Sequence, residues 1–173
     1  MRNIAFYGPM CSGKTYLAQY LVRNYDYEKT GFSVPLKLAA KDLFGIDPNN
    51  KDDKTRKLLQ GFSDDVKKWG GEDIFVKALL RDVSDEGYKF VVDDLRYPFE
   101  ANALREVGFT IISVNCYETI RQERILNLYP DTSLEAQQHK SEQDYKEIEP
   151  DYVVWSNKPD DVKDLERLLN GRT

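Results

Sequence analysis

The residues with the clearest chemical meaning form one glycine-rich stretch near the start of the chain, Gly8-Pro9-Met10-Cys11-Ser12-Gly13-Lys14-Thr15. This stretch matches the pattern G-x-x-x-x-G-K-[ST] without a gap. The two glycines let the backbone turn tightly, so that its N–H groups can surround phosphate oxygens. Lys14 would reach the β and γ phosphates of a nucleotide, and the Thr15 hydroxyl would bind Mg²⁺. The pattern therefore predicts a site for ATP and Mg²⁺.

The segments on either side of this stretch are the ones that a phosphate-binding loop requires. Residues 3–7 are typical of a buried strand, and residues 16–25 are typical of a helix. The order strand, loop, helix distinguishes such a loop from a chance glycine-rich turn. The thiol in the loop is interpreted as a small filler in a tight turn rather than as a reactive group. Nucleotide contacts are expected from Gly8, Cys11, Ser12, Gly13, Lys14, Thr15 and Tyr16.

Two acids and an arginine follow a second apolar stretch. Asp93 and Asp94 end a strand predicted over residues 88–94, and Arg96 lies two residues later. Carboxylates at the end of a strand beside the loop can hold Mg²⁺, often through water, opposite the Thr15 hydroxyl. The guanidinium of Arg96 could bind a phosphate through two hydrogen bonds. In the alternative interpretation Asp94 and Arg96 form a surface ion pair or cap the next helix.

Arg121 and Arg124 lie three residues apart and therefore share one face of a predicted helix. Phosphoryl transfer spreads negative charge over the moving group, and cations on a lid stabilise that charge while the lid excludes water. We therefore predict a lid over about residues 118–150. In the alternative, the helix is simply solvated and both arginines pair with Glu118 and Glu123.

Strands and helices alternate along the whole chain, and this order must position the predicted site. It predicts a parallel five-stranded sheet covered by helices on both faces, a three-layer α/β/α P-loop NTPase fold with a helical lid. Right-handed crossovers bring the loops after the strands to one edge of the sheet, where such folds bind ligands. The strands are expected at residues 3–7, 28–33, 88–94, 109–116 and 152–155.

Length and composition fit one domain over residues 1–173. Hydrophobic residues make up 40% of the 173 positions, which is enough for a core. The net charge of −5 argues against a protein that coats DNA. No membrane-length apolar run or signal-peptide pattern is visible, and Cys11 and Cys116 make no disulfide framework, so we expect a cytoplasmic protein. The oligomeric state stays open, with a homodimer as one arrangement.

Four stretches, taken in order, resemble the bacteriophage deoxynucleoside monophosphate kinase family, and animal-type phosphomevalonate kinases are similar in the same places. The stretches are the phosphate loop, VDDLRYPFEA at 92–101, HKSE at 139–142 and DYVVWSN at 151–157. The resemblance implies a P-loop kinase that transfers the γ-phosphoryl of Mg·ATP to a nucleoside or deoxynucleoside monophosphate. It also implies that the protein works in the cytoplasm of an infected host cell if a phage encodes it.

The same resemblance implies roles for further residues. Its acid-x-arginine motif falls on Asp94 and Arg96, with Asp93 as an additional acid that shares the metal role, and its lid arginines fall on Arg121 and Arg124. It implies that Ser33 and Lys37 lie near the acceptor monophosphate and that Asn157 lies near the adenine of ATP. Lys14 and the three arginines would neutralise charge in the transition state, without a covalent enzyme intermediate.

The acceptor base is expected to bind in a helical region over about residues 43–75, which matches the family only loosely. Phe62 and Trp69 could stack on a base there, although two helices of this kind more often use such residues in their core. His139, the only histidine, is interpreted as structural or lid-associated, because a phosphate acceptor is already ionised and needs no general base.

Two other functions stay open at this point. A P-loop kinase could phosphorylate a hydroxyl group, such as that of a hydroxymethylated pyrimidine in phage DNA, with Asp93 or Asp94 as general base. A DNA substrate would favour a basic stripe, but the basic cluster over residues 51–57 is interrupted by two aspartates. The other alternative is a nucleotide-binding switch, which would not need a monophosphate pocket.

Overall fold

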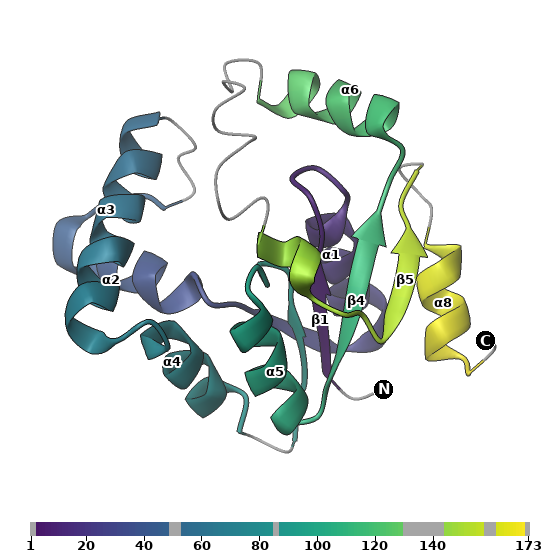
Figure 1. Ribbon diagram of the computed structural model, residues 1–173, viewed down its shortest axis with the longest axis horizontal. Coiled ribbons are helices and arrows are strands. Elements are labelled where there is room, and N and C mark those ends of the chain that lie inside the picture. Colours follow the sequence, from purple (N-terminus) through teal and green to yellow (C-terminus); the bar gives the residue numbers. More distant parts are fainter. Residues whose placement is uncertain (1–2, 49–52, 85–86, 130–143, 158–161, 172–173) are drawn as a thin grey trace.

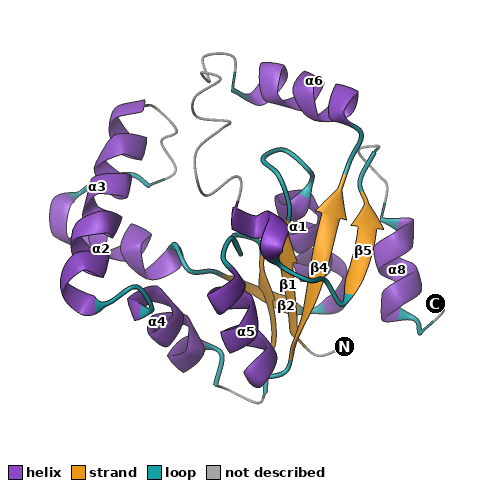
Figure 2. Cartoon of the chain, in the orientation of Figure 1, coloured by secondary structure: helices purple, strands orange, loops and turns teal. Residues whose placement is uncertain are grey.

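A five-stranded parallel sheet forms the centre of the computed structural model, which describes residues 3–48, 53–84, 87–129, 144–157 and 162–171. The strand order is β2-β3-β1-β4-β5 (Figures 1 and 2). This result confirms the predicted sheet. The strands are β1 (Asn3–Tyr7), β2 (Tyr27–Thr30), β3 (Lys89–Val92), β4 (Phe109–Asn115) and β5 (Tyr152–Trp155).

Helices cover both faces of the sheet, as the alternation of side chains along β1 requires. Ile4 and Phe6 are fully buried in a core that includes residues of α1 (Lys14–Tyr25) and α8 (Lys163–Leu169). The intervening Ala5 and Tyr7 belong to the opposite core, with residues of α4 (Ile74–Asp82) and α5 (Pro98–Glu106). The three-layer α/β/α architecture is therefore confirmed.

Strand β2 ends earlier than expected. Strand β2 ends at Thr30, three residues before the predicted end, and α2 (Val34–Phe44) has a proline in its first turn, where the missing N–H costs nothing. The helix ends at Gly45, whose φ of +65° is the left-handed conformation that glycine adopts readily. The short segment between β2 and α2 therefore turns toward the neighbouring strand β3.

The remaining helices lie at two ends of the molecule. Helix α3 (Asp53–Gly70) packs on α2 and α4, beyond the β2 side of the sheet. Helix α6 (Glu118–Leu128) crosses above the carboxyl ends of β4 and β5, and a 3₁₀ turn, η2 (Asp144–Glu147), returns the chain to the sheet (Figure 1). His139 lies outside the described residues. No helix in the described part of the chain has the length and apolar character needed to cross a membrane.

Candidate functional site

All five strands run in the same direction, so the segments that follow them meet at one edge of the sheet. Because β1 lies between β3 and β4, the phosphate loop is flanked by the acidic segment on one side and by the approach to α6 on the other. The segments at this edge are 8–15, 31–33, 93–97, 116–117 and 156–157.

The phosphate loop packs too closely against its neighbours to accept side chains at its two glycines. Gly8 and Gly13 have φ angles of +139° and +107°. A Cβ atom on Gly8 would lie 2.4 Å from the carbonyl oxygen of Val114, and one on Gly13 would lie 2.4 Å from the Oγ of Ser156. The loop is therefore held between the end of β4 and the residue that follows β5.

Polar groups of the loop fit a polyphosphate. The ammonium of Lys14 donates to the carbonyl oxygens of Gly8 and Pro9, both at 2.8 Å, so its charge is held against the loop. Ser12 is fully buried, and its Oγ has no hydrogen-bond partner among the described residues. An unsatisfied buried hydroxyl costs about 1–3 kcal/mol, which a ligand oxygen at the loop would offset. Thr15 and Tyr16, at the start of α1, are exposed.

Cys11 supports the interpretation of a space-filling residue. Burial raises the pKa of its thiol, although the positive charges of Lys14, Arg121 and Arg124 act in the opposite direction. The thiol is therefore protonated at neutral pH and is a poor nucleophile.

The two acids after β3 are engaged differently. Asp93 forms an ion pair with Lys29 at 2.7 Å and is largely buried. Asp94 accepts the backbone N–H groups of Phe32 and Ser33, at 3.0 and 2.9 Å, and the Ser33 hydroxyl at 2.7 Å. The carboxylate of Asp94 thus connects the end of β3 to the segment that begins α2, rather than to the helix that follows it in the sequence.

Glu100 has the capping role that the alternative interpretation gave to Asp94, and it is not among the residues predicted from the sequence. Its Oε2 accepts the backbone N–H groups of Arg96 and Tyr97, at 2.9 and 3.1 Å. The side chain is only 7% exposed, and burial raises its pKa to about 7. A glutamate three residues after a helix start is a known capping signal, but the usual Ser or Thr partner is Tyr97 here, so the signal is weak.

The two arginines of α6 have different hydrogen-bond partners. Nη1 of Arg124 donates to the carbonyl oxygen of Cys11 at 3.3 Å, so this side chain contacts the phosphate loop. Arg121 instead forms two hydrogen bonds to Glu118 on its own helix, at 2.8 and 2.6 Å. Arg124 therefore contacts the phosphate loop, and Arg121 has the local pairing with Glu118 that the alternative interpretation describes.

The segment after β5 is tied to the start of α6. The Oδ1 of Asn157 accepts the backbone N–H of Tyr117 at 2.9 Å, and the rings of Tyr117 and Trp155 lie 5.5 Å apart. On the acceptor side, Ser33 precedes α2 and Lys37 is exposed in its first turns. Ser33 and Asn157 thus lie just after strands β2 and β5, whereas Lys37 lies further along α2.

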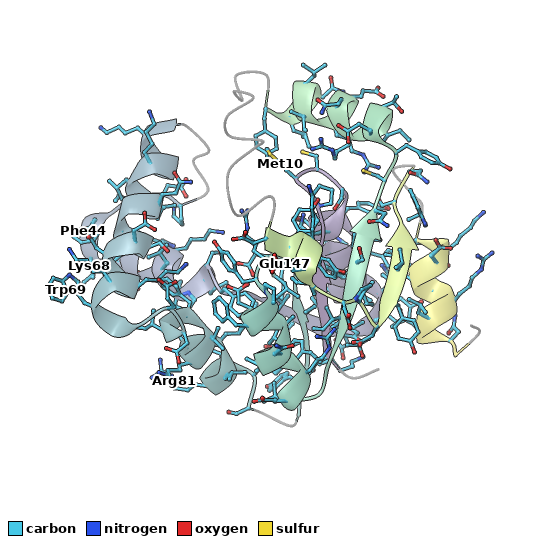
Figure 3. All side chains as sticks on the ribbon, viewed as in Figure 1. Met10, Phe44, Lys68, Trp69, Arg81 and Glu147 are labelled. Atoms are coloured by element: carbon cyan, nitrogen blue, oxygen red, sulfur yellow. The ribbon has the colours of Figure 1, made fainter. Side chains whose placement is uncertain are left out.

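Trp69 lies away from this edge. It is 83% exposed near the end of α3, and the Lys68 ammonium lies 5.3 Å from the centre of its ring. Figure 3 places Trp69, Lys68 and Phe44 together on the outer side of the helical region, far from Met10 in the phosphate loop. Phe62 packs edge-on against Phe44, with ring centres 5.8 Å apart. Trp69 therefore belongs neither to a core nor to the edge where the other predicted residues meet.

The donor set fits Mg²⁺ bound together with a nucleotide. Within the described residues, no group of three or more His, Cys, Asp or Glu side chains could hold a metal ion by itself. Thr15, Asp93 and Asp94 offer only oxygen atoms, and Mg²⁺ in such sites takes one or two protein oxygens, several waters and phosphate oxygens. These residues can therefore complete a metal site that phosphates begin.

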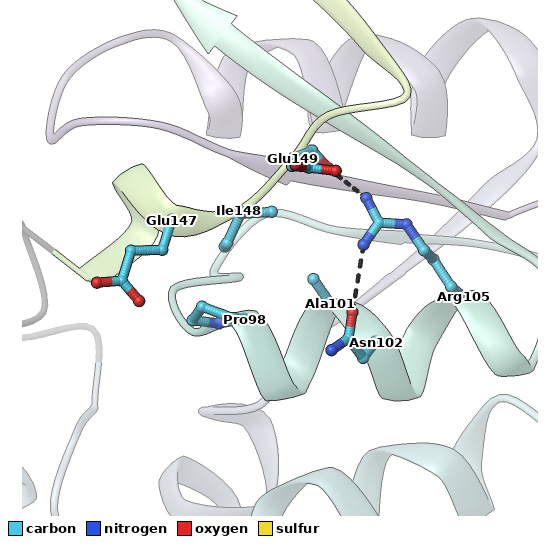
Figure 4. A pocket seen from close by; sticks show the side chains of 7 residues that line it. All are labelled: Pro98, Ala101, Asn102, Arg105, Glu147, Ile148 and Glu149. Carbon is cyan, nitrogen blue, oxygen red and sulfur yellow. Dashed lines mark hydrogen bonds between the residues drawn. The ribbon is translucent and has the colours of Figure 1, made fainter.

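A pocket of about 200 Å³ lies outside this edge, between α5 and η2 (Figure 4). It includes none of the predicted site residues. The guanidinium of Arg105 crosses it and donates to the backbone carbonyl of Glu149 and, at 3.5 Å, to Asn102. The pocket is lined by Pro98, Ala101, Asn102, Arg105, Glu147, Ile148 and Glu149.

Solved structures with the same fold are very different in sequence. TT1252 from Thermus thermophilus is 16% identical with a TM-score of 0.57, over 99% of this chain and 97% of that one. An unliganded sugar kinase from Janibacter sp. HTCC2649 is 14% identical with a TM-score of 0.51, over 100% and 96%. The APS kinase CysC of Mycobacterium tuberculosis, solved with AMPPNP and APS, is 15% identical with a TM-score of 0.51, over 98% and 97%.

These likenesses show a P-loop kinase fold and no more, and no curated protein matches the chain in sequence. A family model gives the closer relationship. The model AAA_18, described as an AAA domain, matches residues 4–148, which is most of the chain and includes the phosphate loop, the acidic segment and α6. The chain therefore belongs to this AAA domain family.

Proposed function

We propose that this protein is an ATP-dependent deoxynucleoside monophosphate kinase, which transfers the γ-phosphoryl of ATP to a monophosphate and forms the diphosphate. The observation that carries the proposal is the arrangement around β1 and β3. Lys14 and Arg124 contact the phosphate loop, while Asp94 joins the neighbouring strand to the start of α2. A donor site and an acceptor helix therefore share one edge of the sheet.

The proposed roles follow from charge and position. Lys14 and Arg124 neutralise the phosphates of ATP, and Arg96 binds the acceptor phosphate. Ser33 and Lys37 lie near the acceptor, and Asn157 lies near the adenine. Gly8, Cys11, Ser12, Gly13 and Tyr16 complete the donor site, and Arg121 joins the catalytic cations when α6 closes.

Mg²⁺, held by Thr15 with Asp93 or Asp94, would neutralise charge on the phosphates. The protein supplies positioning and electrostatic stabilisation, and no covalent intermediate forms on it. We assign the acceptor region to about residues 43–75 and the lid to about residues 118–150, within a single kinase domain.

The engagement of the acids favours a phosphate acceptor over a hydroxyl acceptor. A hydroxyl must lose a proton and therefore needs a general base close by. Asp94 already accepts three hydrogen bonds, and Asp93 is ion-paired with Lys29. A monophosphate is already ionised and places no such demand on either acid. The resemblance to phage deoxynucleoside monophosphate kinases supports the same acceptor.

A coupled assay of ADP formation, with a panel of ribo- and deoxynucleoside monophosphates added one at a time, tests the proposal. At least one monophosphate should raise ADP formation well above the rate with Mg·ATP alone. Duplex DNA that contains hydroxymethylated pyrimidines is tested in parallel. Stimulation by the DNA and by no monophosphate would support the hydroxyl acceptor, and stimulation by neither would leave a nucleotide-binding switch.

A further inference from the structure

Glu100 is a buried carboxylate that the proposed chemistry does not use. Removing a carboxylate from water is costly, and a helix start can be capped by an exposed Ser or Asp at much lower cost. Glu100 is nevertheless 7% exposed, and its Oε2 alone accepts both N–H groups, from Arg96 and from Tyr97. The placement indicates that the stabilisation of the Arg96 and Tyr97 backbone offsets the free-energy cost of burying the carboxylate.

The segment that Glu100 holds is also held at its other end. Asp94, two residues before Arg96, accepts three hydrogen bonds from Phe32 and Ser33. One carboxylate therefore fixes the segment to the start of α2, and the other fixes it to α5. A movement of Arg96 would disturb both connections.

The charged groups around Glu100 act in opposite directions on its ionisation. The negative charge of Asp94, in the same segment, opposes ionisation, and the positive charge of Lys67, on α3, favours it. The backbone N–H groups of Arg96 and Tyr97 also favour the ionised form. Glu100, on α5, therefore holds the segment after β3 through hydrogen bonds and also feels the charge of Lys67 on α3.

We infer that Glu100 is a positioning residue for the acceptor, which fixes the backbone of Arg96 so that its guanidinium meets the acceptor phosphate. This inference rests on the proposed function. Glu100 does not contact the substrate itself. Its loss should therefore weaken the acceptor site and leave the binding of ATP at the phosphate loop unchanged.

Steady-state kinetics of Glu100→Ala and Glu100→Gln test the inference. Glu100→Ala removes both hydrogen bonds and should raise KM for the monophosphate about tenfold or more, because small misplacements of a catalytic cation are costly. KM for ATP should stay within about twofold, as expected for a site held by separate residues. Glu100→Gln keeps an acceptor oxygen and should restore most of the monophosphate KM. Equal changes in both KM values, or no change in either, would overturn the inference.

A double-mutant cycle with Arg96→Ala separates positioning from a general loss of stability. If Glu100 acts through Arg96, Glu100→Ala should not raise the monophosphate KM further when Arg96 is already absent. Additive effects would contradict the inference. Asp151→Ala is the matched control for Glu100→Ala, because Asp151 also accepts a backbone N–H, from Ile111 at 2.7 Å, but lies at the opposite end of the sheet.

Amide hydrogen exchange keeps the inference testable if the proposed function fails. If no monophosphate stimulates ADP formation by the wild-type protein, the proposed kinase reaction is wrong. The hydrogen bonds from the Arg96 and Tyr97 backbone to Glu100 can still be tested. Exchange of the Arg96 and Tyr97 amides should be faster in Glu100→Ala and near normal in Glu100→Gln. Unchanged exchange in Glu100→Ala would overturn the inference independently of any activity.

Discussion

The hydroxyl and the backbone N–H of Ser33 both donate to the same carboxylate oxygen of Asp94, at 2.7 and 2.9 Å. The two residues are 61 positions apart and follow neighbouring strands. Asp94 therefore sets where α2 begins, and a site built from β3 and α2 depends on this contact. Mutation of Asp94 would therefore change the acceptor side of the site even if Asp93 were the acid that binds the metal.

Gly31→Ala tests this connection without changing a charged group. A Cβ at position 31 would lie 2.5–2.8 Å from the carboxylate of Asp94, so the acid must move. We expect KM for the monophosphate to rise about tenfold and the protein to lose about 1–3 kcal/mol of unfolding free energy. The measurements are steady-state kinetics and chemical denaturation.

Gly61→Ala is the matched control for Gly31→Ala. A Cβ at position 61 of α3 would meet nothing within 4 Å. It should leave KM for ATP unchanged and stabilise the helix by about 0.4–1 kcal/mol, so it controls for the added methyl group, although position 61 lies within the proposed acceptor region. A Gly31→Ala protein with normal monophosphate KM would contradict the role given to Asp94.

The two arginines of α6 are expected to respond differently to truncation. Arg124→Ala removes the contact with the carbonyl of Cys11 and should lower kcat about 100-fold, the typical effect of losing one preorganised donor. Arg121→Ala breaks a pair with Glu118, in which the Arg121 side chain is 16% exposed and Glu118 is exposed, and its effect on kcat should be smaller because Arg121 does not contact the loop. Single-turnover rates of both variants measure the difference. A larger loss for Arg121→Ala would mean that α6 rearranges extensively around ATP.

The pKa of Glu100 predicts a pH-dependent stability. Its folded pKa of about 7 lies above the ordinary value of 4.5, so folding favours the protonated form. The wild type should therefore lose stability relative to Glu100→Gln as pH rises from about 4.5 to 7, by no more than about 3 kcal/mol, with no further change above that range.

Urea denaturation of the wild type and Glu100→Gln at pH 5, 6, 7 and 8 checks this expectation. Glu106→Gln is the control, because Glu106 is exposed at the other end of α5. The difference in unfolding free energy between this variant and the wild type should not show the same dependence on pH. If the difference in unfolding free energy between the wild type and Glu100→Gln is the same at every pH, Glu100 is ionised in the folded protein throughout this range.

Sequence periodicity predicted the fold well because helical segments separate the apolar strand segments along the chain. Strand β5 has the predicted bounds, residues 152–155. The end of β2 could not be predicted, because it is decided by Asp94, a residue distant in sequence that draws Phe32 and Ser33 out of the strand. Local pattern contains no information about such a contact.

The site could be predicted only where a motif fixes spacing. The phosphate loop and the acid-x-arginine motif specified positions along the chain, and the parallel sheet then placed them at one edge. Trp69 shows the opposite case, because an aromatic residue on a helix gives no sign of which side it faces, and the structure leaves it 83% exposed. Glu100 was missed because its partners are backbone N–H groups, which a sequence does not display.

The most direct test of the central claim follows the phosphoryl group itself. The protein is incubated with Mg²⁺ and γ-radiolabelled ATP and each deoxynucleoside monophosphate, and the products are separated by chromatography. The label should appear in a deoxynucleoside diphosphate, and Lys14→Ala should reduce its formation about 100-fold or more while the exposed-lysine control Lys77→Ala does not. Label that stays in ATP or appears only as inorganic phosphate with every monophosphate would contradict the proposed kinase activity.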